Sequence, residues 1–315
     1  RSDHASARTL LTSALDLHRA TDGPDAIDTL TVQLDLAELL SWLHEPRAAE
    51  ALAADADARL VRHHGTLHAL RGTALQVRAA VADSPALARR QLEEAVRISR
   101  ASVAVDDPRR IRRVSALAAA RLREGRHAEA EALLDEALRD AARVNGGRAP
   151  VTIGVLTNRA ALDMARGDAR AAEARHRAAL GLAIELIGPD SFQVANALNN
   201  LAVAAANQGR YGEAVAALRD SHARHVRLFG AAHPRTINAA RNVGMALFLG
   251  DRASECVTWM RAAADQRHRV AGGTDASAAY MRAQLARCLA RSGEAREAVT
   301  TLERALPVLE ASGSG

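Results

Sequence analysis

Residues of three kinds recur at a fixed interval of 42 positions, and this period constrains the fold more than any other feature of the chain. The first series is Pro108, Pro150, Phe192 and Pro234. The second series is Ala130, Ala172, Ala214, Cys256 and Ala298. The third series is polar and consists of Asn158, Asn200, Asn242 and Gln284. A period shared by such different residue types indicates one structural unit that is copied along the chain.

The segment from residue 190 to residue 230 shows the plan of one unit. Apolar or small residues follow a helical spacing in two stretches, and Gly209 interrupts the pattern between them. Because only about four residues join the two stretches, the helices must fold back on each other as an antiparallel hairpin. The same pattern predicts hairpins at residues 27–63, 66–103, 107–142, 149–186, 190–228, 233–270 and 274–310.

The repeats predict an all-α solenoid of about seven helical hairpins that occupies residues 1–315 as a single domain. The spacing is regular over residues 107–310 and degenerate over residues 27–103. Residues 5–20 have the pattern of one further, unpaired helix, which suggests that the chain starts inside a repeat of a longer polypeptide. Residues 312–315 carry no pattern and are expected to form a disordered tail.

The composition excludes several classes of enzyme. Lysine and arginine together number 42, and every one of these residues is arginine. A P-loop, a protein-kinase lobe and a Schiff-base enzyme each need a lysine, so the chain can contain none of them. It also has no nucleophile elbow, zinc-protease helix or glycine-rich phosphate loop. We therefore expect no enzymatic activity, no catalytic residue, no cofactor and no metal site.

The charge pattern indicates a mixed surface. The formal net charge is +5, and 37 acidic residues are interspersed with the arginines. Such a mixture is typical of solvated helix faces more than of a nucleic-acid groove. The densest basic run extends from Arg109 to Arg113, and we interpret it as a solvated face whose charge Asp106 and Asp107 offset. An acidic partner or a nucleic-acid phosphate is the alternative interpretation of this run.

The cysteines and the hydropathy of the chain indicate its cellular compartment. Cys256 and Cys288 fall on apolar positions of neighbouring predicted helices, and we expect both thiols to be reduced. A bond between them is the alternative, because neighbouring helices can bring them together. No apolar run approaches membrane-spanning length, and no secretory signal is visible. These features predict a cytoplasmic protein without a membrane partner.

The most regular part of the chain resembles a known repeat family. The residues that carry the resemblance are LNNLAVAAANQGRYGEAVAALRDS, then LFGAAHPRT and INAARNVGMAL. They are similar to the tetratricopeptide repeat, and more narrowly to the 42-residue repeats of kinesin light chains and of many bacterial signalling proteins. The resemblance covers residues 107–310 well and residues 27–103 by pattern only. It implies a right-handed superhelix whose first helices line an inner groove for extended or helical peptides.

The periodic asparagines are the best candidates for ligand binding. The resemblance maps the frequent groove asparagine of the family onto Asn158, Asn200 and Asn242. Asn196 and Asn238 lie one helical turn earlier on the same face as Asn200 and Asn242. Asn199 is the neighbour of Asn200, and Gln284 is the next member of the periodic series after Asn242. An amide both donates and accepts, so a row of amides can hold a peptide backbone. The alternative is that these amides bond to neighbouring helices and only hold the repeats together.

Several arginines share the same predicted face, namely Arg112, Arg241, Arg287 and Arg291. A guanidinium suits a carboxylate, so these residues could select an acidic peptide or a C-terminus. Pairing with local acidic residues on a mixed surface is the alternative.

Three functions follow from these observations, in order of preference. The first is a protein–protein interaction module, a signalling scaffold that binds a protein or peptide in its groove. The second is a regulatory or sensor domain that acts on an upstream domain of the same polypeptide, such as a kinase or a nucleotide switch. The third is nucleic-acid binding, which we regard as the least favoured because aromatic stacking residues make up only 2% of the chain.

Overall fold

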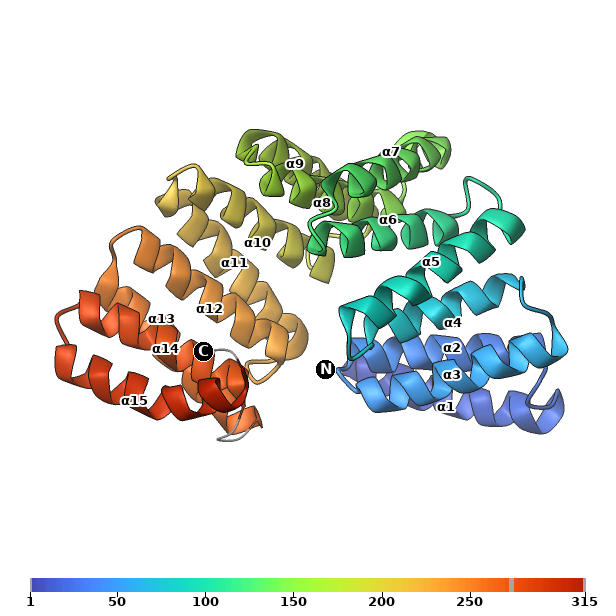
Figure 1. Ribbon diagram of the computed structural model, residues 1–315, viewed down its shortest axis with the longest axis horizontal. Coiled ribbons are helices and arrows are strands. Elements are labelled where there is room, and N and C mark those ends of the chain that lie inside the picture. Colours follow the sequence, from blue (N-terminus) through green and yellow to red (C-terminus); the bar gives the residue numbers. More distant parts are fainter. Residues whose placement is uncertain (1, 272–274, 314–315) are drawn as a thin grey trace. The chain divides into compact units, whose positions relative to one another are not determined.

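The computed structural model describes residues 2–271 and 275–313, and all the regular secondary structure in these ranges is helical (Figure 1). The predicted all-α repeat fold is therefore confirmed. The helices form two compact units, Arg1–Leu162 (unit 1) and Asp163–Gly315 (unit 2). That residues 1–315 form a single domain stays a prediction.

Unit 1 follows the first predicted hairpins closely. Its elements are α1 (Ser2–Thr21), α2 (Ile27–Trp42), α3 (Pro46–His63), α4 (Ala69–Ala80), α5 (Pro85–Ser102), α6 (Pro108–Arg123), α7 (His127–Arg143), the short η1 (Asn145–Gly147) and the first part of α8 (Pro150–Ala165). The pairs α2–α3, α4–α5 and α6–α7 correspond to the hairpins expected up to residue 142. The pattern thus predicted the hairpins even where the 42-residue spacing is degenerate.

The first helix packs against the first hairpin. Leu15 of α1 belongs to one buried cluster with Leu30 and Leu34 of α2. At the other end of the helix, Arg8 Nη1 donates to Glu45 Oε1 at 2.6 Å. The helix expected at residues 5–20 is present, and α2 covers its apolar side.

Unit 2 contains the last part of α8 and the remaining hairpins. Its further helices are α9 (Ala169–Leu186), α10 (Phe192–Asn207), α11 (Tyr211–Phe229), α12 (Pro234–Leu249), α13 (Ala253–Ala271), α14 (Ala276–Arg291) and α15 (Ala295–Ala311). These bounds agree with the predicted hairpins at residues 190–228, 233–270 and 274–310. The agreement arises because proline or a capping side chain opens each first helix and a short turn ends it.

Capping side chains explain why the first helices begin where they do. Asp107 Oδ1 accepts a hydrogen bond from the backbone N–H of Arg109 at 2.7 Å, and Pro108 takes the first helical position. Asp275 Oδ1 accepts from the backbone N–H of Ala278 at 2.7 Å in the same way. Proline is tolerated at this position because its missing N–H would have no partner inside the helix.

Small residues let the paired helices approach closely. Gly244 of α12 is buried, and a Cβ added there would lie 2.9 Å from Met260 Cε on α13. Ala202, Val243 and Leu247 belong to the same buried core as Met260. The core of unit 2 is thus built mainly from alanine and aliphatic residues, in agreement with the low aromatic content.

One expectation about the core is wrong. Cys256 of α13 and Cys288 of α14 are joined by a disulfide, whereas we expected two reduced thiols. Both residues are buried, and their Cα atoms lie 5.8 Å apart. This separation is within the usual range for a disulfide. The sequence places the two cysteines on neighbouring helices, but only the packing of α13 on α14 brings their Cα atoms to this distance.

The last described residues follow α15. Ser312 and Gly313 form a turn after α15, and Ser312 Oγ donates to Leu309 O at 2.8 Å. The rest of the tail expected at 312–315 lies outside the described residues. No helix in the described ranges is both long and apolar enough to cross a membrane.

Candidate functional site

Four polar side chains of α10 and α12 form a relay of hydrogen bonds in unit 2. Arg241 Nη2 donates to Asn242 Oδ1 at 3.0 Å. Asn242 Nδ2 donates to Asn199 Oδ1 at 2.8 Å, and Asn199 Nδ2 donates to Asn200 Oδ1 at 3.4 Å. All the donors point the same way, from α12 to α10. The relay therefore ends at the Nδ2 group of Asn200, which has no acceptor among the described residues.

Two further asparagines of the predicted site lie on the same helices. Asn196 is half-buried on α10, and Asn238 is exposed on α12. Within the described ranges neither side chain has a hydrogen-bond partner. Each amide can thus still donate two hydrogen bonds and accept others.

A pocket of 400 Å³ adjoins the relay. Asn238 and Arg241 of α12 form one side, and Ser277, Tyr280 and Met281 of α14 form the other. Tyr280 is 50% exposed, so its ring is available to a ligand. Among the residues that the structure describes, no acidic residue lines this pocket. Arg241 Nε is buried and has no hydrogen-bond partner, which leaves the pocket with an incompletely satisfied cation.

The remaining predicted residues of unit 2 lie elsewhere on α14. Gln284 is only 6% exposed, and its buried Oε1 accepts no hydrogen bond in the described structure. Arg287 is exposed, and its guanidinium carbon lies 4.7 Å from the centre of the Phe248 ring. Arg287 is thus held by a cation–π contact with α12. Neither residue lines the pocket beside Tyr280.

Asn158 of α8 is held within unit 1. Its Nδ2 group donates to the backbone O of Ser115 at 3.1 Å and to Ser115 Oγ at 2.8 Å. Ser115 lies on α6 and is buried. These bonds link neighbouring first helices, which is the structural role considered for the asparagines.

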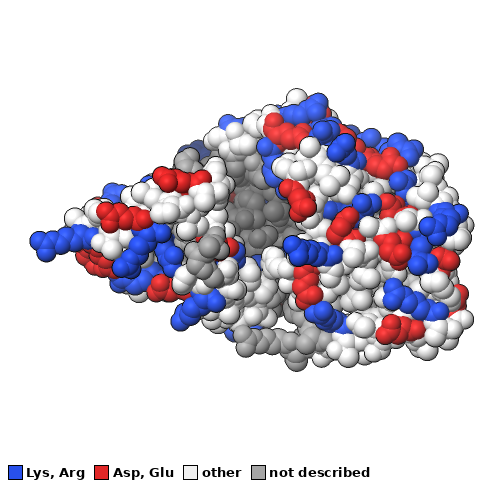
Figure 2. Space-filling model, turned by 60° about the horizontal axis from the view of Figure 1, so that its bottom comes forward, with Lys and Arg blue, Asp and Glu red and all other residues white. Residues whose placement is uncertain are grey.

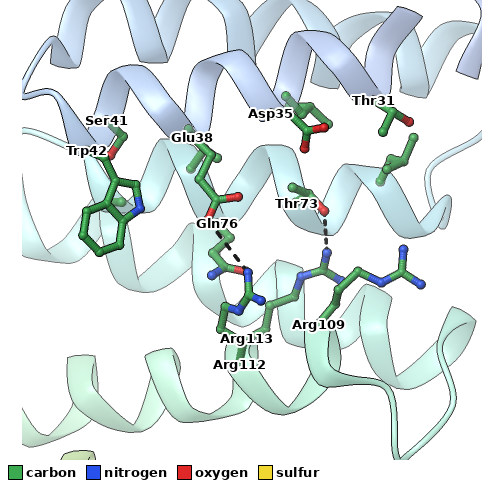
Figure 3. Close-up of a pocket in the computed structure, with 14 residues that line it drawn as sticks. Thr31, Asp35, Glu38, Ser41, Trp42, Thr73, Gln76, Arg109, Arg112 and Arg113 are labelled. Carbon is green, nitrogen blue, oxygen red and sulfur yellow. Dashed lines mark hydrogen bonds and ion pairs between the residues drawn. The ribbon is translucent and has the colours of Figure 1, made fainter. Parts of the chain in front are cut away.

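Unit 1 has a larger pocket, of 420 Å³, which the first helices α2, α4 and α6 surround (Figure 3). Asp35 and Glu38 come from α2, and Thr73 comes from α4 (Figure 3). Arg112 and Arg113 come from α6 (Figure 3). Acidic and basic residues therefore lie on opposite sides of the pocket, and α4 lies between them. Of the residues predicted to bind ligands, only Arg112 lines it.

Arg113 is the most unusual residue of this pocket. Its side chain is 1% exposed, and the chain offers no carboxylate within ion-pair distance of it in the described ranges. Nη1 donates to Ser99 Oγ and Nη2 donates to Thr73 Oγ1, each at 2.7 Å, whereas Nε has no partner. Burial lowers the pKa of Arg113 to about 10. The guanidinium thus stays charged at neutral pH in a place where water is largely excluded.

The basic run around Arg113 differs from the solvated face that we expected. Arg109 pairs with Asp107 at 2.7 Å, as predicted. Arg112 lies 3.8 Å from Glu38 of α2, and Arg110 lies 3.6 Å from Glu136 of α7. The expectation is wrong for Arg113, because the side chain points between α4 and α5 and not into solvent.

Sequence reasoning missed Asp35, Glu38, Trp42 and Tyr280 as pocket residues. The first three lie in the degenerate part of the chain, where no periodic polar position marks them. Asp35 and Glu38 are three residues apart on α2, which places them on one helix face. This spacing was a usable signal. The structure is needed, however, to show that the arginines of α6 lie opposite this face of α2.

The surface charge is mixed, as the composition predicts. Figure 2 shows arginine and acidic side chains interspersed over the visible face of the molecule. Many of them pair between consecutive hairpins, for example Arg219 with Glu255 at 2.8 Å and Arg261 with Glu297 at 2.8 Å. Among the residues that the structure describes, no three His, Cys, Asp or Glu side chains are grouped so that they could hold a metal ion.

The stacked hairpins of each unit define the class of protein: they have the helical repeat fold of tetratricopeptide-repeat proteins. Residues 194–235 match the family model of the tetratricopeptide repeat, so the predicted resemblance is confirmed. No curated protein matches the chain.

Several solved structures are similar to the chain. BtubC (BKLC) from P. vanneervenii is 24% identical with a TM-score of 0.61, and the alignment covers 73% of this chain and 91% of that one. The apo quorum sensor NprR from B. thuringiensis is 12% identical with a TM-score of 0.67, and the coverages are 96% and 82%. The Rap conjugation gene regulator of the plasmid pLS20, in complex with the Phr* peptide, is 13% identical with a TM-score of 0.64 and coverages of 90% and 75%. At these identities the similarity concerns the fold.

Proposed function

We propose that this chain is a non-enzymatic protein–protein interaction module that binds a peptide segment on the α10–α12–α14 face of unit 2. One observation carries the proposal: the amide relay ends in a free donor, Asn200 Nδ2, and starts at Arg241 in the wall of an open pocket. The fold supports it, because a protein of the same fold is known in complex with a peptide.

Each part of the face has a role in this proposal. The free amides of Asn196, Asn200 and Asn238 hydrogen-bond the peptide backbone, which needs both donors and acceptors. Arg241 attracts an acidic side chain or a C-terminal carboxylate, since no acidic residue of the described ranges shares its pocket. Tyr280 offers its exposed ring to an apolar side chain of the ligand.

The test is a selection from a library of random peptides on the full chain, followed by affinity measurements on the peptides recovered. We expect the peptides to be enriched in Asp and Glu. The double variant Asn200→Ala/Asn242→Ala should bind them at least about tenfold more weakly, because one backbone hydrogen bond and the relay are lost. Circular dichroism and thermal unfolding establish that the variant is folded.

Asn207→Ala is a matched control, because Asn207 lies on α10 and its Nδ2 only donates to Val203 O at 2.9 Å. Its affinity for the selected peptides should equal that of the parent chain. Equal affinity of a folded Asn200→Ala/Asn242→Ala variant would contradict the proposal, as would a selection that recovers no peptide.

The other expectations stay predictions. Regulation of an upstream domain is one of them. Nucleic-acid binding is another, and the mixed charge of Figure 2 does not favour it. A cytoplasmic location also stays a prediction. The Cys256–Cys288 disulfide bears on it, because such bonds are rare in reducing compartments.

A further inference from the structure

Helix α15 carries a stripe of apolar side chains that are exposed to solvent. Val299, Leu302 and Leu306 are 57%, 39% and 42% exposed, and the exposed Ala295 extends the stripe by one helical turn. Their spacing of three and four residues places them on one face of the helix. Single exposed apolar residues are common on protein surfaces, whereas a continuous row of them indicates an interaction site.

The 42-residue period shows what covers this stripe in the preceding repeat. One period earlier, on α13, the equivalent residues are Val257, Met260 and Ala264, which are 5%, 0% and 0% exposed. Val257 and Met260 share a buried cluster with Leu285 of α14, and Ala264 shares another with Met281 of α14. Residues further along α13 thus lie beside residues earlier on α14, so the two helices are antiparallel. The stripe of α15 has the residue pattern of a surface that packs against an antiparallel helix.

This stripe is unfavourable as a surface in contact with water. A solenoid is usually closed by a repeat with a polar outer face, because the stacking face of an internal repeat is apolar. α15 keeps large aliphatic residues at two of the positions that are buried in α13, and its Leu306 is larger than the equivalent Ala264. An interface with another helix would remove these side chains from water.

Two charged side chains border the stripe on one side and indicate which helix fits it. Arg296 and Glu303 are seven residues apart and exposed, and neither forms an ion pair among the described residues. When a second copy of α15 lies antiparallel on the first, Leu302 meets Val299 of that copy and Leu306 meets its Ala295. In this register Arg296 of each copy lies beside Glu303 of the other. A parallel arrangement would instead place like charges opposite each other.

We propose that α15 is a self-association surface, through which two copies of this chain form a dimer with two-fold symmetry. Each α15 takes the place over the other that α14 has over α13. A two-fold axis makes the two helices antiparallel and repeats the pair of Arg296 with Glu303 on both sides of it. The surface contains none of the residues proposed to bind a peptide, so the dimer does not depend on the function proposed above.

Sedimentation velocity of the full chain tests the proposal. One helix from each copy makes a small interface, so we expect a reversible dimer with a dissociation constant of about 1–100 µM. The mean mass should rise from that of one chain to that of two as the protein concentration is raised across this range.

An apolar-to-charged variant tests the stripe. Leu302→Glu/Leu306→Glu should associate at least about tenfold more weakly, because the carboxylates would be buried against apolar residues of the other copy. Leu10→Glu/Leu17→Glu is the matched control, since these leucines of α1 are 70% and 63% exposed and belong to unit 1. It should dimerise as the parent chain does. Circular dichroism and thermal unfolding establish that both variants are folded.

A charge exchange tests the antiparallel register. Arg296→Glu and Glu303→Arg should each weaken the dimer several-fold, because each places like charges side by side twice. The combined variant Arg296→Glu/Glu303→Arg should restore the affinity of the parent chain. These positions are exposed, so the exchange leaves the core of unit 2 unchanged.

Three results would overturn the proposal. They are a monomer at every concentration up to about 1 mM, which would exclude even a weak interface, a dimer that a folded Leu302→Glu/Leu306→Glu variant keeps, and a combined charge variant that is no better than the single ones. Loss of the dimer in Leu10→Glu/Leu17→Glu alone would place the interface on α1 and contradict the assignment to α15.

Discussion

At the scale of single residues, the burial of Arg113 depends on the absence of a side chain at Gly72. Gly72 of α4 is buried, and a Cβ added there would lie 2.6 Å from Arg113 Nη1 and 2.7 Å from its Cζ. The absence of a side chain at residue 72 thus makes room for the guanidinium. Thr73, next in sequence, then accepts its hydrogen bond.

Gly72→Ala is expected to destabilise unit 1 by about 1–3 kcal/mol, because the buried guanidinium must move or the helices must separate. Urea unfolding of the full chain measures the change. Gly154→Ala is the control in α8, where an added Cβ has no atom within 4 Å. It should stabilise the helix by up to about 1 kcal/mol, since alanine is the better helix former. Equal stability of Gly72→Ala and Gly154→Ala would contradict the close approach of the Arg113 side chain to residue 72.

At the scale of helices, two kinds of link join consecutive hairpins. The first is polar, such as Asn242 of α12 with Asn199 of α10 at 2.8 Å. The second is covalent, since the disulfide joins α13, the second helix of one hairpin, to α14, the first helix of the next. Each link connects neighbouring repeats, which agrees with a fold in which each repeat contacts its neighbours.

Reduction of the disulfide should destabilise unit 2. Cys256 and Cys288 are 32 residues apart, and closing a loop of this length contributes about 3–4 kcal/mol in the chain-entropy model. Thermal unfolding with and without a reductant measures this effect. Cys256→Ala/Cys288→Ala should unfold at the lower temperature in both conditions. If the reductant lowered the unfolding temperature of the double variant as much as that of the parent chain, its effect would have a cause other than the loss of the disulfide.

The helices were more predictable than the contacts of their side chains. Pro108 and Pro234 marked helix starts within one or two residues, because their local chemistry alone restricts the backbone. The partner of Asn158 could not be predicted in the same way, since Ser115 lies 43 residues earlier on another helix. The burial of Arg113 was likewise not predictable, because it depends on Gly72 in a repeat without regular spacing.

At the scale of the whole molecule, buried histidines are unequally distributed between the two units. Burial lowers the pKa of His176, His222 and His225, which all lie in unit 2. Among the described histidines of unit 1, burial lowers the pKa of the partly exposed His68. Each lowered pKa means that the folded state binds a proton less readily than the unfolded chain does.

Unit 2 should therefore lose stability in acid before unit 1 does. The stabilising contribution is present above the ordinary histidine pKa of 6.5 and is lost as the pH falls through the lowered values. A tenfold difference in proton affinity corresponds to about 1.4 kcal/mol. Hydrogen exchange at neutral and mildly acidic pH resolves the two units. His225→Gln should reduce the pH dependence of unit 2, and equal acid sensitivity of both units would contradict this prediction.

The division between the units has a practical consequence for dissecting the molecule. It falls after Leu162, inside the uninterrupted helix α8, and not in a loop. A chain cut there would expose backbone groups in the middle of a helix, whereas Gly167 (φ 81°) lies in the turn that follows α8. Fragments intended to report on one half alone should accordingly be divided at this turn, with α8 kept whole on the N-terminal fragment.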